Sequence, residues 1–443
     1  MKPIGQMEEL LIQSVHIIDP QSSFHDQLVD IRISQGKIVE MGRAHELTTE
    51  GDILKMEGIK VYASPGWVDM EAHLCDPGFE HRERLEEMAQ AALFGGFTRV
   101  LAYPNTDPVL DKASILSHLV HRAASLPVQI HFTGKITAGE KSLAELYEMH
   151  RRGALAFTNG DEPLDHQGLW LRALQYTKIF DGLTLKYPFN EALAHAGQMA
   201  ESEAALHLGM GGVPEAAESS ALAADLETMR YEPGRVHIQP LTSPRAWELL
   251  RKAQEDLPQL SGGIPLAYVA FDDRVLSEFD PAYKLSPPLR HLRQVAQLHQ
   301  FLQDGTIQAL TTGHRAQEVE SKDLDFVVAA PGMLGLQTYF ALSYQSLIEK
   351  SIIDLSRWVE LSSLNPRAIL KLPPATIDVG TEAEITLFSP DIQWTFTKAH
   401  LFSPAVNSPL LGKKLKGKAL GIFANGRWHS ADTLAMKGKD TYL

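Results

Sequence analysis

Short apolar runs alternate with longer amphipathic segments from Pro65 to about Leu370. Eight runs have the length and composition of buried strands: Trp67–Leu74, Thr98–Tyr103, Val128–Thr133, Ala154–Thr158, Leu183–Tyr187, Arg235–Gln239, Ile264–Ala270 and Ile307–Thr312. A helical pattern follows each run, for example in Glu83–Phe94, Ser142–Arg151, Pro244–Gln254 and Leu334–Glu349. Eight strand-then-helix units over roughly 300 residues predict an α/β fold, the parallel (β/α)8 TIM barrel.

The two ends of the chain show a different, β-rich pattern. It covers Leu10–Ile18, Leu28–Ile33 and Lys37–Met41 at one end, and Glu384–Phe388, Trp394–Lys398 and Ala419–Asn425 at the other. Neither end is large enough for a good core by itself. We therefore expect residues 1–63 and 371–443 to form one composite β-sandwich domain beside a barrel domain of residues 64–370. The glycine-rich stretch Leu206–Glu215 is expected to be a loop at the barrel mouth.

Composition narrows the class of protein only coarsely. The 443 residues are 44% hydrophobic and 22% charged, which is typical of a globular protein with a substantial core. The net charge of −14 argues against nucleic acid or an anionic membrane as a partner. The single cysteine, Cys75, excludes an internal disulfide. Residues 1–6 lack the apolar region of a signal peptide, so we expect a cytoplasmic protein.

Candidate chemistry begins at the end of the first predicted barrel strand, which reads Asp69-Met70-Glu71-Ala72-His73. Positions 71 and 73 of a strand face the same side. Two histidines there would direct two imidazoles at one metal ion. A Glu71–His73 pair offers a weaker version of the same site.

Several longer motifs carry a family resemblance: Pro65-Gly66-Trp67-Val68-Asp69, Asp76-Pro77-Gly78-Phe79-Glu80-His81, Tyr103-Pro104-Asn105-Thr106-Asp107-Pro108, Lys284-Leu285-Ser286-Pro287-Pro288-Leu289-Arg290 and Asn407-Ser408-Pro409. Over almost its whole length the chain resembles the dihydroorotases of the amidohydrolase superfamily that have an aspartate at the fourth strand. The resemblance implies a barrel of the metal-dependent hydrolase type with a β-sandwich. It also implies the reversible closure of carbamoyl aspartate to dihydroorotate in pyrimidine synthesis.

That reaction sets clear demands on the site. Attack on an unactivated amide needs a water whose pKa a bound divalent metal lowers to about 7. A carboxylate must also carry the proton to the leaving nitrogen. In the family resembled here, two strand-one histidines, two later histidines, a strand-four aspartate and a strand-eight aspartate do this work.

This sequence departs from the family at the positions on the first and fourth strands. Glu71 replaces the first strand-one histidine, and only His73 remains. Cys75 stands where the family has an arginine for the substrate carboxylate. In the fourth-strand segment, Asp161 could serve as the aspartate if its loop shifts by one or two residues.

The later positions depart as well. Tyr187 and Pro240 stand at the fifth- and sixth-strand histidines, with His237 three residues deeper in the strand. Gly313 stands at the strand-eight aspartate and is followed by His314. A rescue metal site built from Glu71, His73, Asp161, Lys186, His237 and His314 is the competing interpretation.

Simpler roles are expected for several of these residues. We expect His237 to be a hydrogen-bonded strand histidine and Lys186 to pair with Glu71 or Asp69. We expect Cys75 to be inert. The resemblance places three residues near the substrate or its loop: Asn105, Ser286 and Arg290.

The sequence thus predicts a dihydroorotase-like protein that is catalytically inactive, binds no cofactor and has a structural or regulatory role. By resemblance, aspartate carbamoyltransferase is the expected partner, and a homodimer is expected. One alternative is an active dihydroorotase or other cyclic amidohydrolase that binds zinc through rearranged ligands. Another is a protein that holds a pyrimidine-pathway metabolite in the old pocket.

Overall fold

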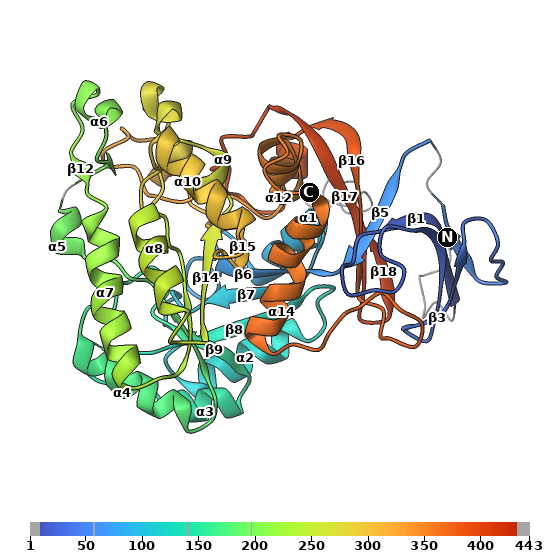
Figure 1. Cartoon of the computed structure of the whole chain (residues 1–443), viewed down its shortest axis with the longest axis horizontal. Helices are drawn as coiled ribbons and strands as arrows, with labels where there is room; N and C mark the ends of the chain where they lie inside the picture. Colours follow the sequence, from blue (N-terminus) through green and yellow to red (C-terminus); the bar gives the residue numbers. More distant parts are fainter. Residues whose placement is uncertain (1–8, 56–57, 140, 196, 432–443) are drawn as a thin grey trace.

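The apolar runs between Trp67 and Thr311 form the parallel barrel that the sequence predicts (Figure 1). The computed structural model describes residues 9–55, 58–139, 141–195 and 197–431. The barrel strands, in hydrogen-bonded order, are β6 (Trp67–His73), β7 (Phe97–Tyr103), β8 (Gln129–Lys135), β9 (Ala154–Thr158), β10 (Leu183–Lys186), β13 (Arg235–Ile238), β14 (Leu260–Pro265) and β15 (Ala309–Thr311). A bridge between Ala72 and His314 brings the chain after β15 against β6 and nearly closes the ring.

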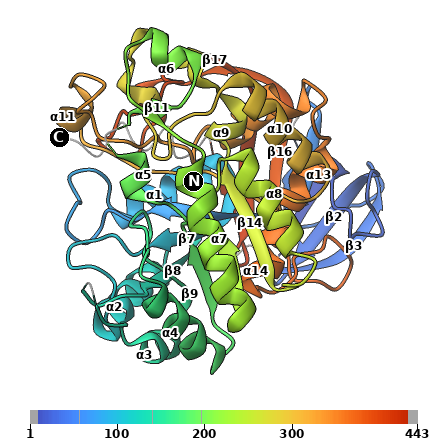
Figure 2. The same cartoon turned by 60° about the vertical axis from the view of Figure 1, so that its left-hand side comes forward.

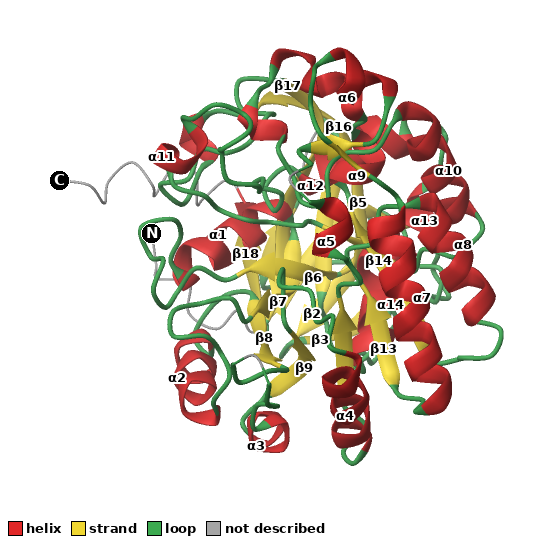
Figure 3. Cartoon of the chain, turned by 90° about the vertical axis from the view of Figure 1, so that its left-hand side faces the viewer, coloured by secondary structure: helices red, strands yellow, loops and turns green. Residues whose placement is uncertain are grey.

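Helices surround the strands (Figure 3). The main ones are α1 (Leu85–Gly95), α2 (Ala113–Ala123), α3 (Leu146–Arg151), α4 (Gln167–Lys178), α7 (Ala216–Tyr231), α8 (Pro244–Ala253), α10 (Leu292–Gln303), α13 (Leu355–Val359) and α14 (Asn365–Leu370). Shorter helices are α5 (Glu191–Ala194), α6 (Glu203–His207), α9 (Ala267–Ala270) and α11 (Val319–Lys322). No helix in the described part of the chain is both long enough and apolar enough to span a membrane.

Two barrel elements differ from the sequence prediction. The seventh strand lies at Leu260–Pro265, four residues before its predicted start. Its two glycines interrupt the apolar pattern on which the prediction depends. Packing requires glycine at position 262, because a Cβ there would lie 2.7 Å from the Trp247 ring. The helix expected at Leu334–Glu349 is limited to α12 (Tyr339–Ser343) and a π-helical turn, Tyr344–Ile348. The backbone N–H groups of Gly335 and Leu336 donate to the His314 ring and are not part of that helix.

The predicted mouth loop Leu206–Glu215 is partly ordered into secondary structure. It contains the end of α6 and β12 (Gly212–Val213), which pairs in parallel with β11 (Met199–Ala200). Figure 2 shows this segment above the barrel.

The two ends of the chain join in a separate eight-stranded sheet, as the sequence predicts. Its strands are β1 (Glu9–Ile17), β2 (Leu28–Ser34), β3 (Lys37–Arg43), β4 (Asp52–Leu54), β5 (Val61–Pro65), β16 (Ile385–Thr395), β17 (Lys414–Ala424) and β18 (Arg427–Ser430). The early strands meet the late ones where β5 pairs with both β1 and β16. Residues 1–8 and 432–443 of the predicted end segments lie outside the described residues.

A buried charge cluster connects the barrel to this sheet. Glu384, just before β16, accepts hydrogen bonds from Arg99 of β7 at 2.8 Å and from Arg367 of α14 at 2.5 Å. Burial opposes the charge of Glu384, but the two arginines lower its pKa to about 2. The cluster therefore stays ionised at neutral pH and holds three distant chain segments together.

Candidate functional site

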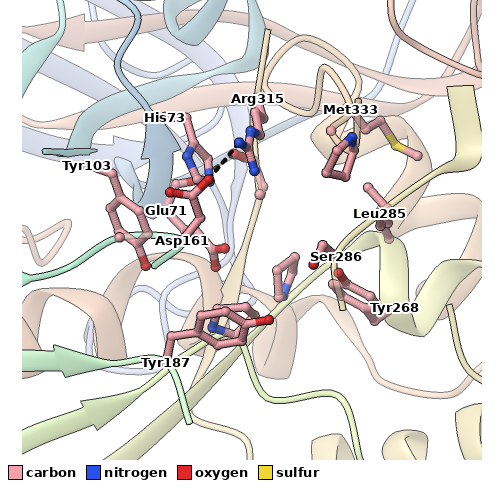
Figure 4. Close-up of a pocket in the computed structure, with 18 residues that line it drawn as sticks. Glu71, His73, Tyr103, Asp161, Tyr187, Tyr268, Leu285, Ser286, Arg315 and Met333 are labelled. Carbon is pink, nitrogen blue, oxygen red and sulfur yellow. Dashed lines mark hydrogen bonds and ion pairs between the residues drawn. The ribbon is translucent and has the colours of Figure 1, made fainter. Parts of the chain in front are cut away.

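A pocket of about 50 Å³ lies at the carboxyl ends of the barrel strands, where barrels of this type place their chemistry (Figure 4). Strand β6 supplies Glu71 and His73, and β7 supplies Tyr103. The segments that follow other strands supply Asp161, Tyr187, Pro240, Ser286, Gly313 and Arg315. Most of the positions singled out in the sequence therefore meet in one place.

A register shift in β6 places the Glu71 side chain in the pocket. The shift lies between Asp69 and Ala72, in the pairing of β6 with β7. Met70 packs in the barrel core while the next residue, Glu71, also lines the pocket. Asp69 accepts hydrogen bonds from the backbone and hydroxyl of Thr312, at 2.9 and 2.6 Å. One buried carboxyl group, Glu71, thus lines the pocket, and a second, Asp69, is buried outside its lining.

Burial is the largest influence on the pKa values of Asp69, Glu71 and His73 at the end of β6. It raises the pKa of Asp69 to about 6, and burial together with Asp69 raises the pKa of Glu71 to about 8. Glu71 accepts a hydrogen bond from the Thr311 hydroxyl at 3.0 Å. Burial and the charge of Arg315 lower the pKa of His73 to about 3, so its ring is neutral near pH 7.

Arg315 adds a positively charged side chain to the pocket that no sequence motif predicts. Its Nη2 lies 2.6 Å from Oδ2 of Asp161, and the pair crosses the mouth beside His73 (Figure 4). Burial opposes ionisation of Asp161, but the charge of Arg315 lowers its pKa below the usual value. Asp161 therefore does reach the site, as an ion-pair partner of an arginine.

Comparisons with known proteins decide the family. The sequence matches the family described as Dihydro-orotase-like over residues 60–233. Dihydroorotase from Geotalea daltonii is 32% identical over 421 residues, which cover 94% of this chain and 98% of that protein. The chain belongs to the dihydroorotase family. Dihydroorotase from Acetivibrio thermocellus is 31% identical over 420 residues, 94% of this chain and 98% of its own length.

Solved structures show the same fold. L-hydantoinase (dihydropyrimidinase) from Arthrobacter aurescens has a TM-score of 0.84 at 21% identity and covers 96% of each chain. Dihydropyrimidinase from Brevibacillus agri has a TM-score of 0.77 at 18% identity, over 95% of this chain and 94% of its own. Both solved structures therefore share the fold of this chain.

The family depends on a divalent metal, but the donors in this dihydroorotase homologue do not fit one. A catalytic zinc is normally held by three protein ligands. Within the described residues there is no group of three or more histidine, cysteine, aspartate or glutamate side chains that could hold a metal. In the pocket, Asp161 is already paired with Arg315. Of the predicted ligands, only Glu71, His73 and Asp161 line the pocket.

The other two predicted ligand histidines point elsewhere. His237 is fully buried, with Nδ1 2.7 Å from the Ser261 hydroxyl and Nε2 2.9 Å from the Gln239 amide oxygen. Burial lowers its pKa to about 4, so it is a neutral, hydrogen-bonded strand histidine. Gln239 in turn donates to the Tyr103 hydroxyl at 2.7 Å. No motif in the sequence predicts this layer of hydrogen-bonded polar side chains.

His314 is likewise committed to the protein interior. Its Nδ1 accepts from backbone N–H groups, so Nε2 carries the proton and donates to Glu83 at 2.9 Å. Its ring therefore has no lone pair free for a metal. The alternation of side chains explains the difference from Gly313 and Arg315, which flank it and line the pocket.

The expected pairing of Lys186 with Glu71 or Asp69 is wrong. On β10, Leu183 and Leu185 fill the barrel core, so Lys186 points outward toward the helices. Its Nζ lies 3.2 Å from Asp225 of α7 and donates to the Leu164 carbonyl. Because neighbouring residues of a strand face opposite sides, Lys186 pairs with a helix residue outside the barrel and not with the acids inside it.

Of the three predicted substrate contacts, only Ser286 lines the pocket. Arg290 is buried away from it and pairs with Glu218, while its Nε donates to Thr242 at 3.0 Å. Asn105 donates to the Asn159 carbonyl at 3.0 Å and packs against Gly160, where a Cβ would collide with its amide. Both residues support the mouth without lining it.

Cys75 and Gly313 also have clear environments. The Cys75 thiol packs with Ala316, Leu334 and Ala405, and burial raises its pKa to about 12. It lies outside the pocket, and its burial and raised pKa agree with the expectation that it is unreactive. Gly313 lines the pocket with a φ of 57°, and an added Cβ would lie 2.9 Å from Pro265.

Proposed function

We propose that this member of the dihydroorotase family is not a catalyst and instead has a structural or regulatory role. The observation that carries the proposal is the Arg315–Asp161 ion pair in the pocket. It engages the aspartate that could have bound a metal and places a fixed positive charge beside His73. A second cation at the same place would be repelled.

The loss of the proton carrier points in the same direction. Gly313, at the position of the strand-eight aspartate, has no group to move a proton to a leaving nitrogen. A water without a bound metal keeps a pKa near 15.7. Metal and carrier act as a unit, so the absence of suitable side chains for both removes the reaction.

A hydrolysis assay tests this proposal. We expect the purified, zinc-supplemented chain to leave dihydroorotate unchanged, while an active dihydroorotase assayed alongside opens the ring. Elemental analysis of the same sample should find less than one zinc per chain. Turnover within about a hundredfold of the ~10 s⁻¹ typical of enzymes would overturn the proposal.

The alternative is an active dihydroorotase or another cyclic amidohydrolase with rearranged zinc ligands. The 32% identity to a dihydroorotase over 94% of this chain favours it. It requires Asp161 to leave Arg315 when zinc binds. Zinc content near one or two per chain, lost in a D161N variant but kept in a D272N variant of an exposed ion pair, would support it.

For the role that replaces catalysis, we propose assembly with aspartate carbamoyltransferase, with this chain as a homodimer. The support is the family resemblance and the retention of the whole fold. Mixed with the aspartate carbamoyltransferase of the same organism, the chain should elute at higher mass from a sizing column. Separate elution of the two proteins over a range of salt concentrations would count against this partner.

A further inference from the structure

A second hollow, separate from the pocket, lies where the barrel meets the eight-stranded sheet of the chain ends (Figure 1). This junction groove has a volume of about 650 Å³ and shares no lining residue with the pocket. Its polar lining comes from the amino ends of β7 and β8, from two hairpin turns of the sheet and from the loop before β16: Arg99, Gln129, Gln35, Asn425, Thr381 and Glu384. It is therefore a candidate site of its own.

The two hairpin turns form one wall of the junction groove. Both residues of Gln35-Gly36 and of Asn425-Gly426 have positive φ, as in the type I′ turns that join paired strands. A Cβ on Gly36 would lie 3.6 Å from the Gly426 Cα, so the turns pack close together. Gln129 of the barrel donates to the Asn425 amide oxygen at 2.9 Å. The groove is thus a defined polar space, and its volume is within the range of small-molecule sites.

The charges in the wall of the junction groove do not balance. Arg99 and Arg367 share the single carboxylate of Glu384. Burial and the charge of Arg99 lower the pKa of the adjacent His131 to about 4, so this ring adds no charge but is neutral near pH 7. One positive charge is left over. Arg99 is 7% exposed and Arg367 is 3% exposed, and a buried charge without a counter-charge is costly.

Arg99 also has N–H groups that lack an acceptor. A guanidinium has five N–H donors. Nε and Nη2 of Arg99 donate to Glu384 at 2.9 and 2.8 Å, and Nη1 lies 3.3 Å from Nε2 of His131. One N–H on Nη1 and one on Nη2 remain without an acceptor among the residues that the structure describes. Since Arg99 lines the junction groove, an acceptor bound there can reach them.

The remaining acid of the groove lining does not supply the missing charge. Glu382 lies at the rim, with its side chain 80% exposed and 3.9 Å from the Lys37 ammonium group. The two opposite charges offset each other, and exposed pairs of this kind contribute little to a buried site. The excess positive charge around Arg99 therefore remains.

We propose that the junction groove binds a small metabolite through an oxyanionic group, a phosphate or a carboxylate, that accepts hydrogen bonds from Arg99. The guanidinium fork matches the oxygens of either group. The amides of Gln35 and Gln129 are placed to bind the polar body of the ligand, and Pro373 and Pro374 add an apolar surface. The inference goes beyond the proposed function, because the groove and the pocket have no residue in common.

Calorimetric melting with inorganic phosphate as the probe tests the inference, because a ligand that contacts both barrel and sheet stabilises the folded chain. Chloride keeps the ionic strength constant. At about ten times its dissociation constant, one bound phosphate should raise the melting temperature of a chain of this length by about 1.5 °C. This rise should saturate, whereas the general stabilisation that phosphate gives by exclusion from protein surfaces does not. Acetate in the same titration tests whether a carboxylate is sufficient.

Three variants locate the site. R99Q should lose the saturable rise, with each variant compared with its own melting temperature in chloride. Q129E places a carboxylate beside Arg99, since Arg99 and Gln129 are paired across β7 and β8, and should lose the rise as well. R274Q removes an exposed arginine that is paired with Asp272 outside the groove, and should keep the rise.

A melting temperature that rises with phosphate to the same extent, and without saturation, in the unchanged protein and in R99Q would overturn the inference. A saturable rise that persists in R99Q or in Q129E would overturn it too, because the anion would then bind elsewhere. None of these results depends on dihydroorotate hydrolysis, so the proposed function is tested separately.

Discussion

The buried Arg290–Glu218 pair gives the sharpest test of how the structure reassigns a predicted substrate residue. Arg290 is 1% exposed and Glu218 is fully buried. Replacing one member of such a pair leaves the other charge without its partner, which typically costs about 3–5 kcal/mol. In an R290M variant, methionine fills most of the vacated volume, so no large cavity adds to this cost.

The remaining hydrogen bonds of Glu218 place the expected loss of unfolding free energy near the lower end of that range. After the substitution, Glu218 still accepts hydrogen bonds from the Thr242 backbone and hydroxyl, at 2.7 and 2.5 Å, and from the Ser243 backbone at 3.0 Å. We therefore expect a loss of about 3 kcal/mol. With an unfolding entropy of about 2.1 cal/mol/K per residue, this lowers the melting temperature of a chain of this length by about 3 °C.

Differential scanning calorimetry measures this shift. R274M, which breaks the exposed pair with Asp272, is the control and should melt like the unchanged protein. An R290M variant that melts within about 1 °C of the unchanged protein would refute the reasoning.

Three other outcomes are expected. G313D should restore no dihydroorotate hydrolysis, and measurable turnover would contradict this. It should also lower the melting temperature more than G313A does, because both side chains strain the φ of 57° and crowd Pro265 but only aspartate adds a polar group. Glu71, with its pKa raised to about 8, binds a proton more tightly in the folded chain, so the unchanged protein should lose stability relative to E71Q as pH rises from 5 to 8; urea midpoints that stay parallel would be the contrary result. Cys75 should resist a thiol reagent in the native protein and react fully in urea, and fast native labelling would show that its burial is wrong.

The barrel and the joined ends were predictable because apolar runs of strand length leave a strong signal. The strand β14 was misplaced by four residues, since packing against Trp247 selects glycine there and glycine carries no apolar signal. At the site, the shared direction of the Glu71 and His73 side chains was predictable, because side chains alternate between the two faces of a strand. The register shift after Asp69 was not, because it depends on how β6 pairs with β7.

Contacts between distant loops were the least predictable. Asp161 and Arg315 come from segments about 150 residues apart, and only the closed ring brings them within 2.6 Å. The family resemblance predicts, residue by residue, where this chain departs from the family's side chains. It could not show that an arginine had entered the space, because nothing in the local pattern around Arg315 indicates the direction of its side chain.

The cluster around Glu384 has a consequence for shortened versions of the chain. A protein that stops after residue 370 would keep Arg99 and Arg367 in the barrel but lose the carboxylate that pairs with both. Two guanidinium groups would then be stranded in a poorly hydrated crevice at the base of the barrel. A premature stop codon near that point should therefore yield an insoluble polypeptide and not a free-standing barrel.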